Sequence, residues 1–229
     1  MKTYRSSEAA GGGRHYVFAV IVLVLLVASP AFGKKHRHSS GSGSASFDYY
    51  LLALSWAPNF CASHPGDHSS ECRVGNQKAF VLHGLWPQSE SGPPPTGCAP
   101  ASPVAHDLVD HMLAYMPSAG LVQHEWREHG TCSGLPAGSY FAQAEEAFKS
   151  VRVPEDLQSL NRESELPVSA LEERFADINH APRKAFRISC HDAELVAVEA
   201  CLDKELHYRE CSSSVRECRG PQVHLQPVR

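Results

Sequence analysis

Eight cysteines are the feature that most constrains how this chain of 229 residues can fold. No two of them stand in a Cys-x-x-Cys arrangement, which zinc sites built on cysteine commonly use. An even number of cysteines in an exported chain instead predicts four disulfides, although the sequence alone leaves the pairing open. The cysteines are Cys61, Cys72, Cys98, Cys132, Cys190, Cys201, Cys211 and Cys218.

The N-terminal segment has the pattern of an export signal. A basic start is followed by an apolar run over residues 16–28 and by the small residues Ala31 and Gly33 at the expected cleavage positions. An uncleaved membrane anchor is the alternative, but the apolar run is short for a span of roughly 20 residues. We therefore expect residues 1–33 to be a signal peptide and the mature protein to be secreted or periplasmic. We expect no stable membrane association after cleavage.

Residues 34–46 are basic and then rich in serine and glycine, which predicts a flexible linker. A single domain is expected over residues 47–229, and we expect it to be a monomer. The formal net charge of −4 argues against general binding of polyanions, so that any contact with nucleic acid must be local.

The predicted elements alternate between strand and helix patterns. Residues 47–56 are nearly all apolar and predict a strand that is buried on both faces and ends at Pro58. A polar loop is expected over residues 61–72, closed by a disulfide, and residues 89–103 are a loop rich in proline and glycine. The other predicted strands are 80–87, 186–190, 194–201 and 223–225, and the predicted helices are 106–116, 121–129, 140–151 and 169–179.

Two helix starts and one helix end carry local signals. Ser102 before Pro103 is expected to open the first helix, and Ser169 with Glu172 resembles a capping box for the last one. Gly130 is expected to end the second helix. Strands at both ends of the domain around a helical middle predict the α+β class, with an antiparallel sheet packed with helices and stabilised by disulfides.

Chemically useful side chains gather between residues 124 and 132. His124, Glu125 and His129 fall within six residues, and the strand at 80–87 adds His83. Each of these histidines stands near glycine or tryptophan at a break in the chain, where a side chain can face a cleft. We therefore expect three imidazoles and one carboxylate to meet at one site.

The remaining histidines have no motif around them and are expected to be solvated or structural. Trp86 and Trp126, which accompany the candidate site, would ordinarily belong to the core. The histidines without a motif are His36, His38, His64, His68, His106, His111, His180, His191, His207 and His224.

Two other kinds of site are weaker alternatives. His124 and Glu125 begin like the zinc motif His-Glu-x-x-His, but His129 follows His124 by five residues, about 140° further around a helix than a full turn. A cysteine nucleophile at Cys132 beside His129 conflicts with the disulfide expected there. We therefore predict no metal and no cofactor.

Three imidazoles with a carboxylate suit the cleavage of RNA, which carries its own nucleophile, the 2′-OH. The reaction needs a base for that proton, an acid for the leaving 5′-oxygen, and donors for the phosphoryl oxygens. Two histidines can act as this acid and base near neutral pH.

At these residues the sequence resembles the ribonuclease T2 family of secreted ribonucleases. Residues 82–87 are similar to the family's first active-site motif and residues 124–132 to its second, while residues 54–56 and 200–204 resemble the bacterial branch. The resemblance covers about residues 47–218. It implies metal-independent cleavage of an RNA substrate, with low base specificity, through a 2′,3′-cyclic phosphate to a 3′-phosphate.

The resemblance also implies roles for individual residues. His83 would be the general acid, His129 the general base, His124 a phosphate ligand and Glu125 a stabiliser of the transition state. Trp86 and Trp126 would shape the substrate-binding cleft or pack behind it. The implied disulfides are Cys61–Cys72, Cys98–Cys132, Cys190–Cys218 and Cys201–Cys211.

One position departs from the family pattern. Glu128 stands where the family usually has a lysine, with Arg127 beside it. The alternative function is therefore a catalytically weak relative that binds RNA or another partner. We expect the Glu128 side chain to point toward solvent, and Arg127 to point about 100° away from it on the helix. We also expect Glu125 and Glu128 to raise the pKa values of His83 and His129.

Overall fold

The computed structural model describes residues 46–229. The predicted signal peptide at 1–33 and almost all of the predicted linker at 34–46 lie outside the described residues. Within residues 46–229, no helix is long and apolar enough to cross a membrane.

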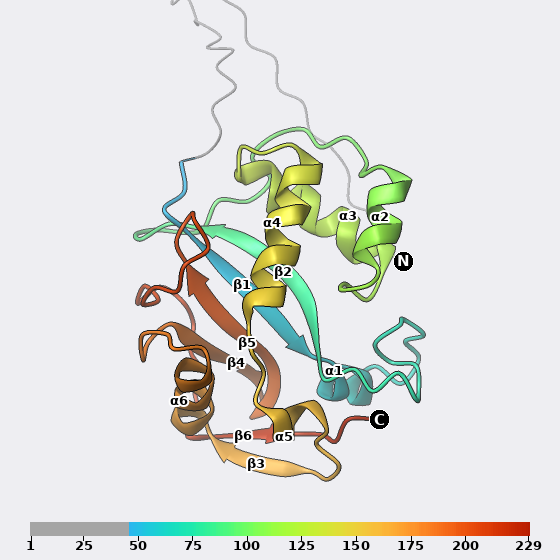
Figure 1. Cartoon of the computed structure of the whole chain (residues 1–229), viewed down its shortest axis with the longest axis vertical. Helices are drawn as coiled ribbons and strands as arrows, with labels where there is room; N and C mark the ends of the chain where they lie inside the picture. Colours follow the sequence, from blue (N-terminus) through green and yellow to red (C-terminus); the bar gives the residue numbers. More distant parts are fainter. Residues whose placement is uncertain (1–45) are drawn as a thin grey trace, which may run out of the picture. The chain divides into compact units, whose positions relative to one another are not determined.

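A six-stranded sheet forms the centre of the domain (Figure 1). The strand order is β2-β1-β5-β6-β3, and β4, which lies off this path, pairs with residues 194–200 of β5. All pairs are antiparallel except β5 with β6, which meet in parallel at Glu194 and His224, so the predicted antiparallel sheet is a mixed one. The strands are β1 Tyr49–Trp56, β2 Phe80–Gln88, β3 Ser164–Pro167, β4 Phe186–His191, β5 Glu194–Leu202 and β6 Gln222–Leu225.

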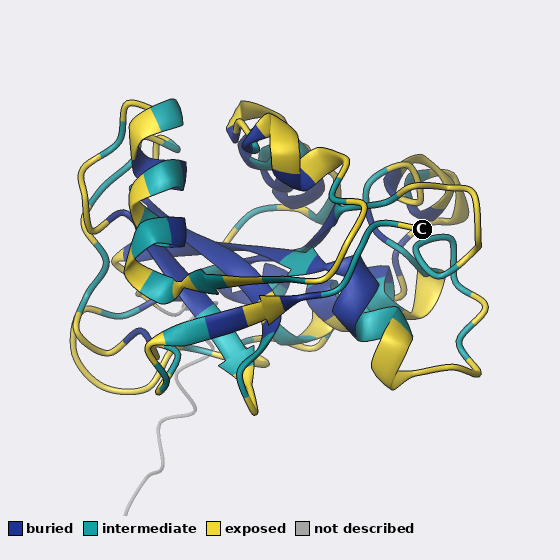
Figure 2. Ribbon diagram, turned by 90° about the horizontal axis from the view of Figure 1, so that it is seen from below, coloured by how far each residue is buried: buried dark blue, intermediate teal, exposed yellow. Residues whose placement is uncertain are grey.

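Helices pack against the sheet, as expected for the α+β class. Helix α4 crosses β1 and β2, and α6 packs against β4 (Figure 1). Figure 2 shows the buried strands in the middle of the domain and the exposed outer sides of the helices around them. The helices are α1 Ala57–Ser63, α2 His106–Met112, α3 Ala119–Glu128, the 3₁₀ helix η1 Gly130–Cys132, α4 Ala137–Ser150, α5 Glu155–Gln158 and α6 Val168–Ile178.

Strand β1 is buried on both faces, as its apolar sequence predicts. Leu52 and Leu54 belong to the main core, whereas Tyr49 and Leu51 join a second apolar cluster with Cys201 on the opposite face. Both faces of the central strands are therefore covered.

A β-bulge interrupts the pairing of β1 with β2. Ala53 of β1 pairs with Gly84 of β2. The next residue of β1, Leu54, pairs with Leu82, so His83 is the extra residue of the bulged strand. Bulges often redirect a side chain next to an active site. Here the bulge coincides with a predicted catalytic histidine.

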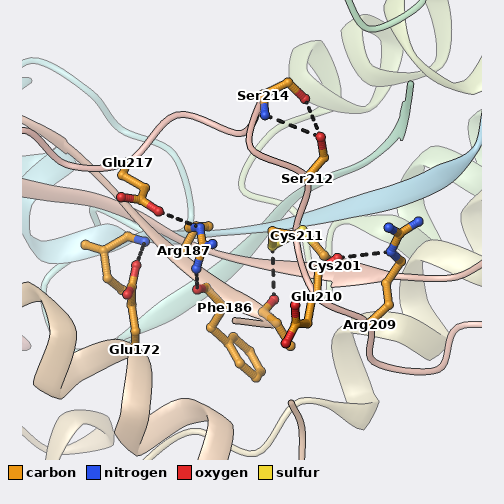
Figure 3. Close-up of a disulfide and its surroundings, with 12 residues drawn as sticks. Glu172, Phe186, Arg187, Cys201, Arg209, Glu210, Cys211, Ser212, Ser214 and Glu217 are labelled. Atoms are coloured by element: carbon orange, nitrogen blue, oxygen red, sulfur yellow. Dashed lines mark hydrogen bonds and ion pairs between the residues drawn. A yellow bond between two sulfur atoms is a disulfide. The ribbon is translucent and has the colours of Figure 1, made fainter. Parts of the chain in front are cut away.

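The structure contains four disulfides and no free cysteine in the described residues. They are the pairs that the family resemblance implies: Cys61–Cys72, Cys98–Cys132, Cys190–Cys218 and Cys201–Cys211. Figure 3 shows Cys201–Cys211 beside an ion pair between Arg187 and Glu217, whose Nε and Oε1 atoms lie 3.0 Å apart.

Both predicted helix-start signals are wrong, although the helices begin within one residue of the predicted positions 106 and 169. Helix α2 begins at His106, and its N-cap is Ala105, not Ser102. Helix α6 begins at Val168, and Ser169 lies inside its first turn, so no capping box forms. The backbone N–H of Val168 donates instead to the carbonyl of Pro221 at 3.0 Å, because α6 starts directly from the paired strands β3 and β6.

Four short elements were not predicted, namely α1, η1, α5 and β3. Pro58 follows β1, as expected, but it stands in the first turn of α1. A proline is tolerated there because its missing N–H would have no partner in the helix anyway. Pro58 therefore follows the end of β1 and lies within the first turn of α1.

Candidate active site

His83 lies between a hydroxyl group and a carboxyl group. Its Nδ1 atom is 3.0 Å from Oγ of Ser55 on β1, and its Nε2 atom is 3.5 Å from Oε1 of Glu125 on α3. The side chain of His83 is 39% exposed, so one edge of the ring faces solvent. The bulge, the serine and the glutamate together hold an accessible imidazole in one orientation.

Glu125 is buried, with only 1% of its side chain exposed. Its Oε2 atom accepts a hydrogen bond from Nε1 of Trp86 at 2.7 Å, but its Oε1 atom has no hydrogen-bond partner. A Cβ atom on Gly84 would lie 2.0 Å from Oε2 of Glu125 and 2.5 Å from Nε1 of Trp86. Glycine at position 84 is therefore the residue that lets this carboxyl group approach β2.

His129 lies where α3 ends and η1 begins. Its ring centroid is 5.3 Å from that of Trp86, and its Nδ1 atom is buried without a hydrogen-bond partner. His83 approaches the same indole at 5.4 Å. Both of the predicted acid–base histidines therefore lie close to the Trp86 ring.

Trp126 packs on the core side of the site. Its ring centroid is 6.0 Å from that of Tyr140, whose hydroxyl group donates to the carbonyl of Leu85 at 2.9 Å. A Cβ atom on Gly130 would lie 2.3 Å from the Trp126 ring. Gly130 therefore permits close packing at the start of η1, while α3 itself ends at Glu128 with His129 as its C-cap.

His124 stands on the exposed side of α3. Its ring centroid is 6.4 Å from that of His129. Nη2 of Arg127 lies 3.2 Å from Nδ1 of His124, and Nε of Arg127 donates to Oε1 of Glu128 at 2.8 Å. Although the two positions are about 100° apart on the helix, the Arg127 side chain curls back along α3 and contacts both Glu128 and His124.

The Cys98–Cys132 disulfide joins the long loop after β2 to η1. Two hydrogen bonds support it. The N–H of Gly97 donates to the carbonyl of Glu128 at 2.8 Å, and the N–H of Cys98 donates to Oγ1 of Thr131 at 3.2 Å. The loop therefore caps the end of α3, directly beside His129.

A sequence model of the ribonuclease T2 family matches residues 47–211. The chain belongs to the ribonuclease T2 family. The match includes both of the segments that carry the four predicted catalytic residues.

Relatives within and beyond the bacteria carry matching names. A probable ribonuclease of Haemophilus influenzae is 36% identical over 144 residues, 56% of this chain and 52% of the relative. A ribonuclease of Aeromonas hydrophila is 38% identical over 116 residues, 51% of each chain. The chain thus spans about half the length of these two bacterial relatives. Ribonuclease DdI of Dictyostelium discoideum is 28% identical over 87% of this chain and 97% of its own.

Solved structures of the T2 type share the fold. An RNase-related protein from Calystegia sepium superposes with a TM-score of 0.64 at 23% identity, covering 80% of this chain and 98% of that one. RNase NT, solved in complex with 5′-AMP, superposes with a TM-score of 0.58 at 22% identity, covering 80% and 99%. At these identities the similarity establishes the α+β fold.

Burial dominates the protonation of the groups at this site. It raises the pKa of Glu125 to about 8, an effect that the hydrogen bond from Trp86 opposes and the nearby charge of Glu128 reinforces. Burial, with the neighbouring His124, lowers the pKa of His83 and of His129 to about 4. The expectation that the carboxylates would raise both histidine pKa values is therefore wrong, because desolvation outweighs the attraction.

Three side chains of this site also carry atoms of the kinds that bind metal ions. One potential ligand atom each from His124, Glu125 and His129 lies within 4.8 Å of the other two. The sequence argument against such a cluster assumed one continuous helix, but α3 ends at Glu128, and the turn brings His129 back toward His124. Against a metal site, the Oε2 atom of Glu125 already accepts from Trp86.

The structure brings His83, Glu125, His129 and Trp86 together, with His124 at the edge and Trp126 behind. Sequence reasoning missed two nearby features. Ser55 contacts His83, and a cavity of about 170 Å³ beside His83 is lined by Ser55 and by Glu71, whose pKa burial raises to about 7. The polar Ser55 inside an otherwise apolar strand was the available signal for the first.

Proposed function

We propose that this protein is an exported, monomeric endoribonuclease that cleaves RNA by transphosphorylation, without a metal ion or cofactor and with low base specificity. The observation that carries the proposal is that the His83 and His129 rings both lie close to Trp86, with centroid distances of 5.4 and 5.3 Å, and that Glu125 lies beside His83. Two imidazoles gathered at one site can act as an acid and a base on one phosphodiester.

In the first step His129 acts as the general base. Its lowered pKa keeps the imidazole neutral around neutral pH, so it can accept the proton of the 2′-OH. The 2′-oxygen then attacks phosphorus, a new P–O bond forms, and the bond to the leaving 5′-oxygen breaks. In the second step water attacks the 2′,3′-cyclic phosphate, the two histidines exchange roles, and a 3′-phosphate results.

The leaving oxygen needs a proton from the opposite side of the phosphate. His83 and Glu125 lie 3.5 Å apart and together hold one proton below about pH 8, since the pKa of Glu125 is raised to about 8. The negative charge of bound RNA favours the protonated imidazole, so it shifts this proton toward His83. His83 then delivers the proton to the 5′-oxygen.

The phosphoryl oxygens need donors as their charge increases. The Oε1 atom of Glu125 is buried and lies 3.5 Å from Nε2 of His83, so Glu125 stabilises the imidazolium once the shared proton has moved to His83. His124, at the exposed edge, supplies a donor to a phosphoryl oxygen. These two residues would stabilise the pentacoordinate transition state.

A catalytically weak protein that binds RNA or another partner is the alternative. Glu128 favours it, because a carboxylate replaces the family lysine. Glu128 is 35% exposed, and the hydrogen bond from Arg127 lowers its pKa. Its charge is therefore partly offset by Arg127, which weakens the case for this alternative.

The test is cleavage of a short RNA by the purified protein in the presence of EDTA. We expect a 2′,3′-cyclic phosphate product, and no cleavage where a 2′-deoxy nucleotide precedes the scissile bond. His83→Ala should lower kcat at least about 100-fold, the usual scale for a general acid. His106→Ala, which removes an imidazole that is 92% exposed, is the matched control and should change nothing. No cleavage by the wild type would favour the binding protein, and activity lost with EDTA would favour a metal site.

A further inference from the structure

Arg127 connects the unusual residue of this site, Glu128, to a predicted phosphate ligand, His124. Its Nε–H donates to Oε1 of Glu128 at 2.8 Å, and its Nη2 lies 3.2 Å from Nδ1 of His124. The planar guanidinium group fixes the direction of both contacts. His124 and Arg127 are separated by three residues on α3, so their side chains lie on one face of the helix.

The donor at this contact can only be Arg127. A guanidinium group carries hydrogens on every nitrogen and remains charged, so it cannot accept a hydrogen bond. Nδ1 of His124 must therefore accept, which places the hydrogen of the neutral ring on Nε2. The remaining N–H of His124 is then available to donate to another group.

Fixed positive charge is otherwise scarce around this site. In the described part of the chain, Arg127 is the only lysine or arginine that is hydrogen-bonded or ion-paired with His83, His124, His129 or Glu128. Arg127 also lies in the last turn of α3, where the helix dipole favours a cation.

We propose that Arg127 and Glu128 form one positioning unit, in which Glu128 orients Arg127 and Arg127 holds His124 as an Nε2–H donor toward a phosphoryl oxygen of RNA. The proposal rests on the proposed function for the identity of that ligand. This unit takes the place of the single lysine that the family pattern has at position 128. Glu128 therefore supports catalysis and does not simply remove a positive charge.

The competing account treats Arg127–Glu128 as an ordinary surface ion pair, since the two side chains are 56% and 35% exposed. Restoring the family lysine separates the two accounts. If Glu128 is only a missing cation, Glu128→Lys raises kcat. If the unit exists, the same change removes the acceptor of Arg127 and places a second cation beside it, so kcat falls.

The kinetic experiment compares Glu128→Lys, Glu128→Gln and Arg127→Met with the wild type on a short RNA. Loss of a charged hydrogen bond commonly costs about tenfold or more. We expect kcat to fall about tenfold in Glu128→Lys and Arg127→Met, and less in Glu128→Gln, which keeps an acceptor oxygen. Arg127→Lys should recover part of the loss, because one donor remains. Higher kcat in Glu128→Lys, or unchanged kcat in Arg127→Met, would overturn the proposal.

The controls come from a similar ion pair on the same molecule. Glu173 of α6 and Arg183 of the following segment lie 2.9 Å apart, and their side chains are 53% and 77% exposed. Glu173→Lys and Arg183→Met make the same changes of charge and should leave kcat unchanged. If they lower kcat as much as the site variants do, a general charge effect explains the loss and the proposal is wrong.

A readout without RNA separates this proposal from the proposed function. Nitrogen NMR of the His124 ring reports which nitrogen carries hydrogen in the neutral form. We expect the Nε2–H form alone in the wild type and a mixture with Nδ1–H in Arg127→Met. The same mixture in both proteins would overturn the positioning unit even if RNA is cleaved. A single Nε2–H tautomer that is lost in Arg127→Met would support the unit even if the wild type cleaves no RNA.

Discussion

Two glutamates with similar neighbours behave in opposite ways in this protein. Glu125, between α3 and β2, accepts from Trp86 and lies 3.5 Å from His83. Glu145, between α4 and α2, accepts from Tyr115 at 2.8 Å and lies 2.6 Å from His111. Each carboxyl group therefore has one aromatic donor and one imidazole as neighbours.

The difference lies in burial and in a cation. Glu145 also pairs with Lys149 and keeps 16% of its side chain exposed, and these hydrogen bonds lower its pKa to about 2. Glu125 is 1% exposed with one unpartnered oxygen, and burial raises its pKa to about 8. A carboxylate with hydrogen-bond partners on both oxygens stays charged. A buried carboxyl group with one unpartnered oxygen retains its proton.

The largest expected effect comes from closing the space that Glu125 occupies. Gly84→Ala would place a Cβ atom 2.0 Å from its Oε2, so the carboxyl group and the Trp86 indole must move. We expect kcat/KM to fall at least about 100-fold and stability by about 1–3 kcal/mol, the usual cost of overpacking. Steady-state kinetics and thermal unfolding measure both.

The control for this change lies on the helix that carries Glu145. A Cβ atom on Gly138 of α4 would meet nothing within 4 Å. Gly138→Ala should therefore stabilise the protein by about 0.5–1 kcal/mol through helix propensity, with unchanged activity. Equal activity in both alanine variants would contradict the packing described around Glu125.

Two disulfides of similar span test whether the site depends on local tethering. Cys98–Cys132 closes a loop of 34 residues beside His129. Cys190–Cys218 closes a loop of 28 residues that begins on β4. The loop-entropy model predicts a loss of roughly 3–4 kcal/mol on removing either bond. Replacing both cysteines of each pair with serine should lower Tm alike, but only loss of Cys98–Cys132 should also lower kcat in the folded protein.

A similar fall in kcat for the two serine pairs, measured well below Tm, would show that the loop bond does not position the site. Unchanged kcat without Cys98–Cys132 would show the same. The two hydrogen bonds from Gly97 and Cys98 to the end of α3 would then be sufficient.

The smallest expected effects are those of glutamine substitutions on stability, and they should have opposite signs at Glu125 and Glu145. Because the pKa of Glu125 is raised in the folded protein, this residue favours the folded state at low pH. That contribution is lost as the pH rises through about 8. Glu125→Gln should therefore raise stability above pH 8 by roughly 1–3 kcal/mol, while lowering kcat. Urea unfolding at two pH values measures this gain.

Glu145 has a lowered pKa, so it contributes stability above its ordinary pKa of 4.5 and loses it as the pH falls through about 2. Glu145→Gln should cost about 1 kcal/mol at neutral pH, because its partners are largely exposed, and nothing near pH 2. The same sign for both glutamine variants at alkaline pH would refute the contrast between the two sites.

The sequence predicted most of the elements, because burial imposes clear patterns on long segments. The apolar run of β1 and the alternation in β5 gave strands within two residues of the observed ends. Short elements that depend on neighbours far along the chain were missed. β3 is only four residues long and ends in Pro167, and it is a strand because β6 pairs with it.

The catalytic motifs were recognisable, but their electrostatics were not. Sequence proximity predicted that the carboxylates would raise the pKa values of His83 and His129, whereas the fold buries Glu125 against Gly84 and desolvates both histidines. The contact of Arg127 with His124 was within reach, since a spacing of three residues places both on one face of α3. The bulge at His83 has no local signal, because it depends on the register of β1.

The pH dependence of kcat/KM for RNA cleavage tests the central claim most directly, namely that the buried His83–Glu125 pair supplies the proton for the leaving group. The account predicts a bell-shaped profile, with an acid limb near pH 4 from His129 and an alkaline limb near pH 8 from the pair. In Glu125→Gln the alkaline limb should move to lower pH, because His83 alone has a lowered pKa. A wild-type rate that rises steadily to about pH 9, or an alkaline limb unchanged in Glu125→Gln, would contradict this claim.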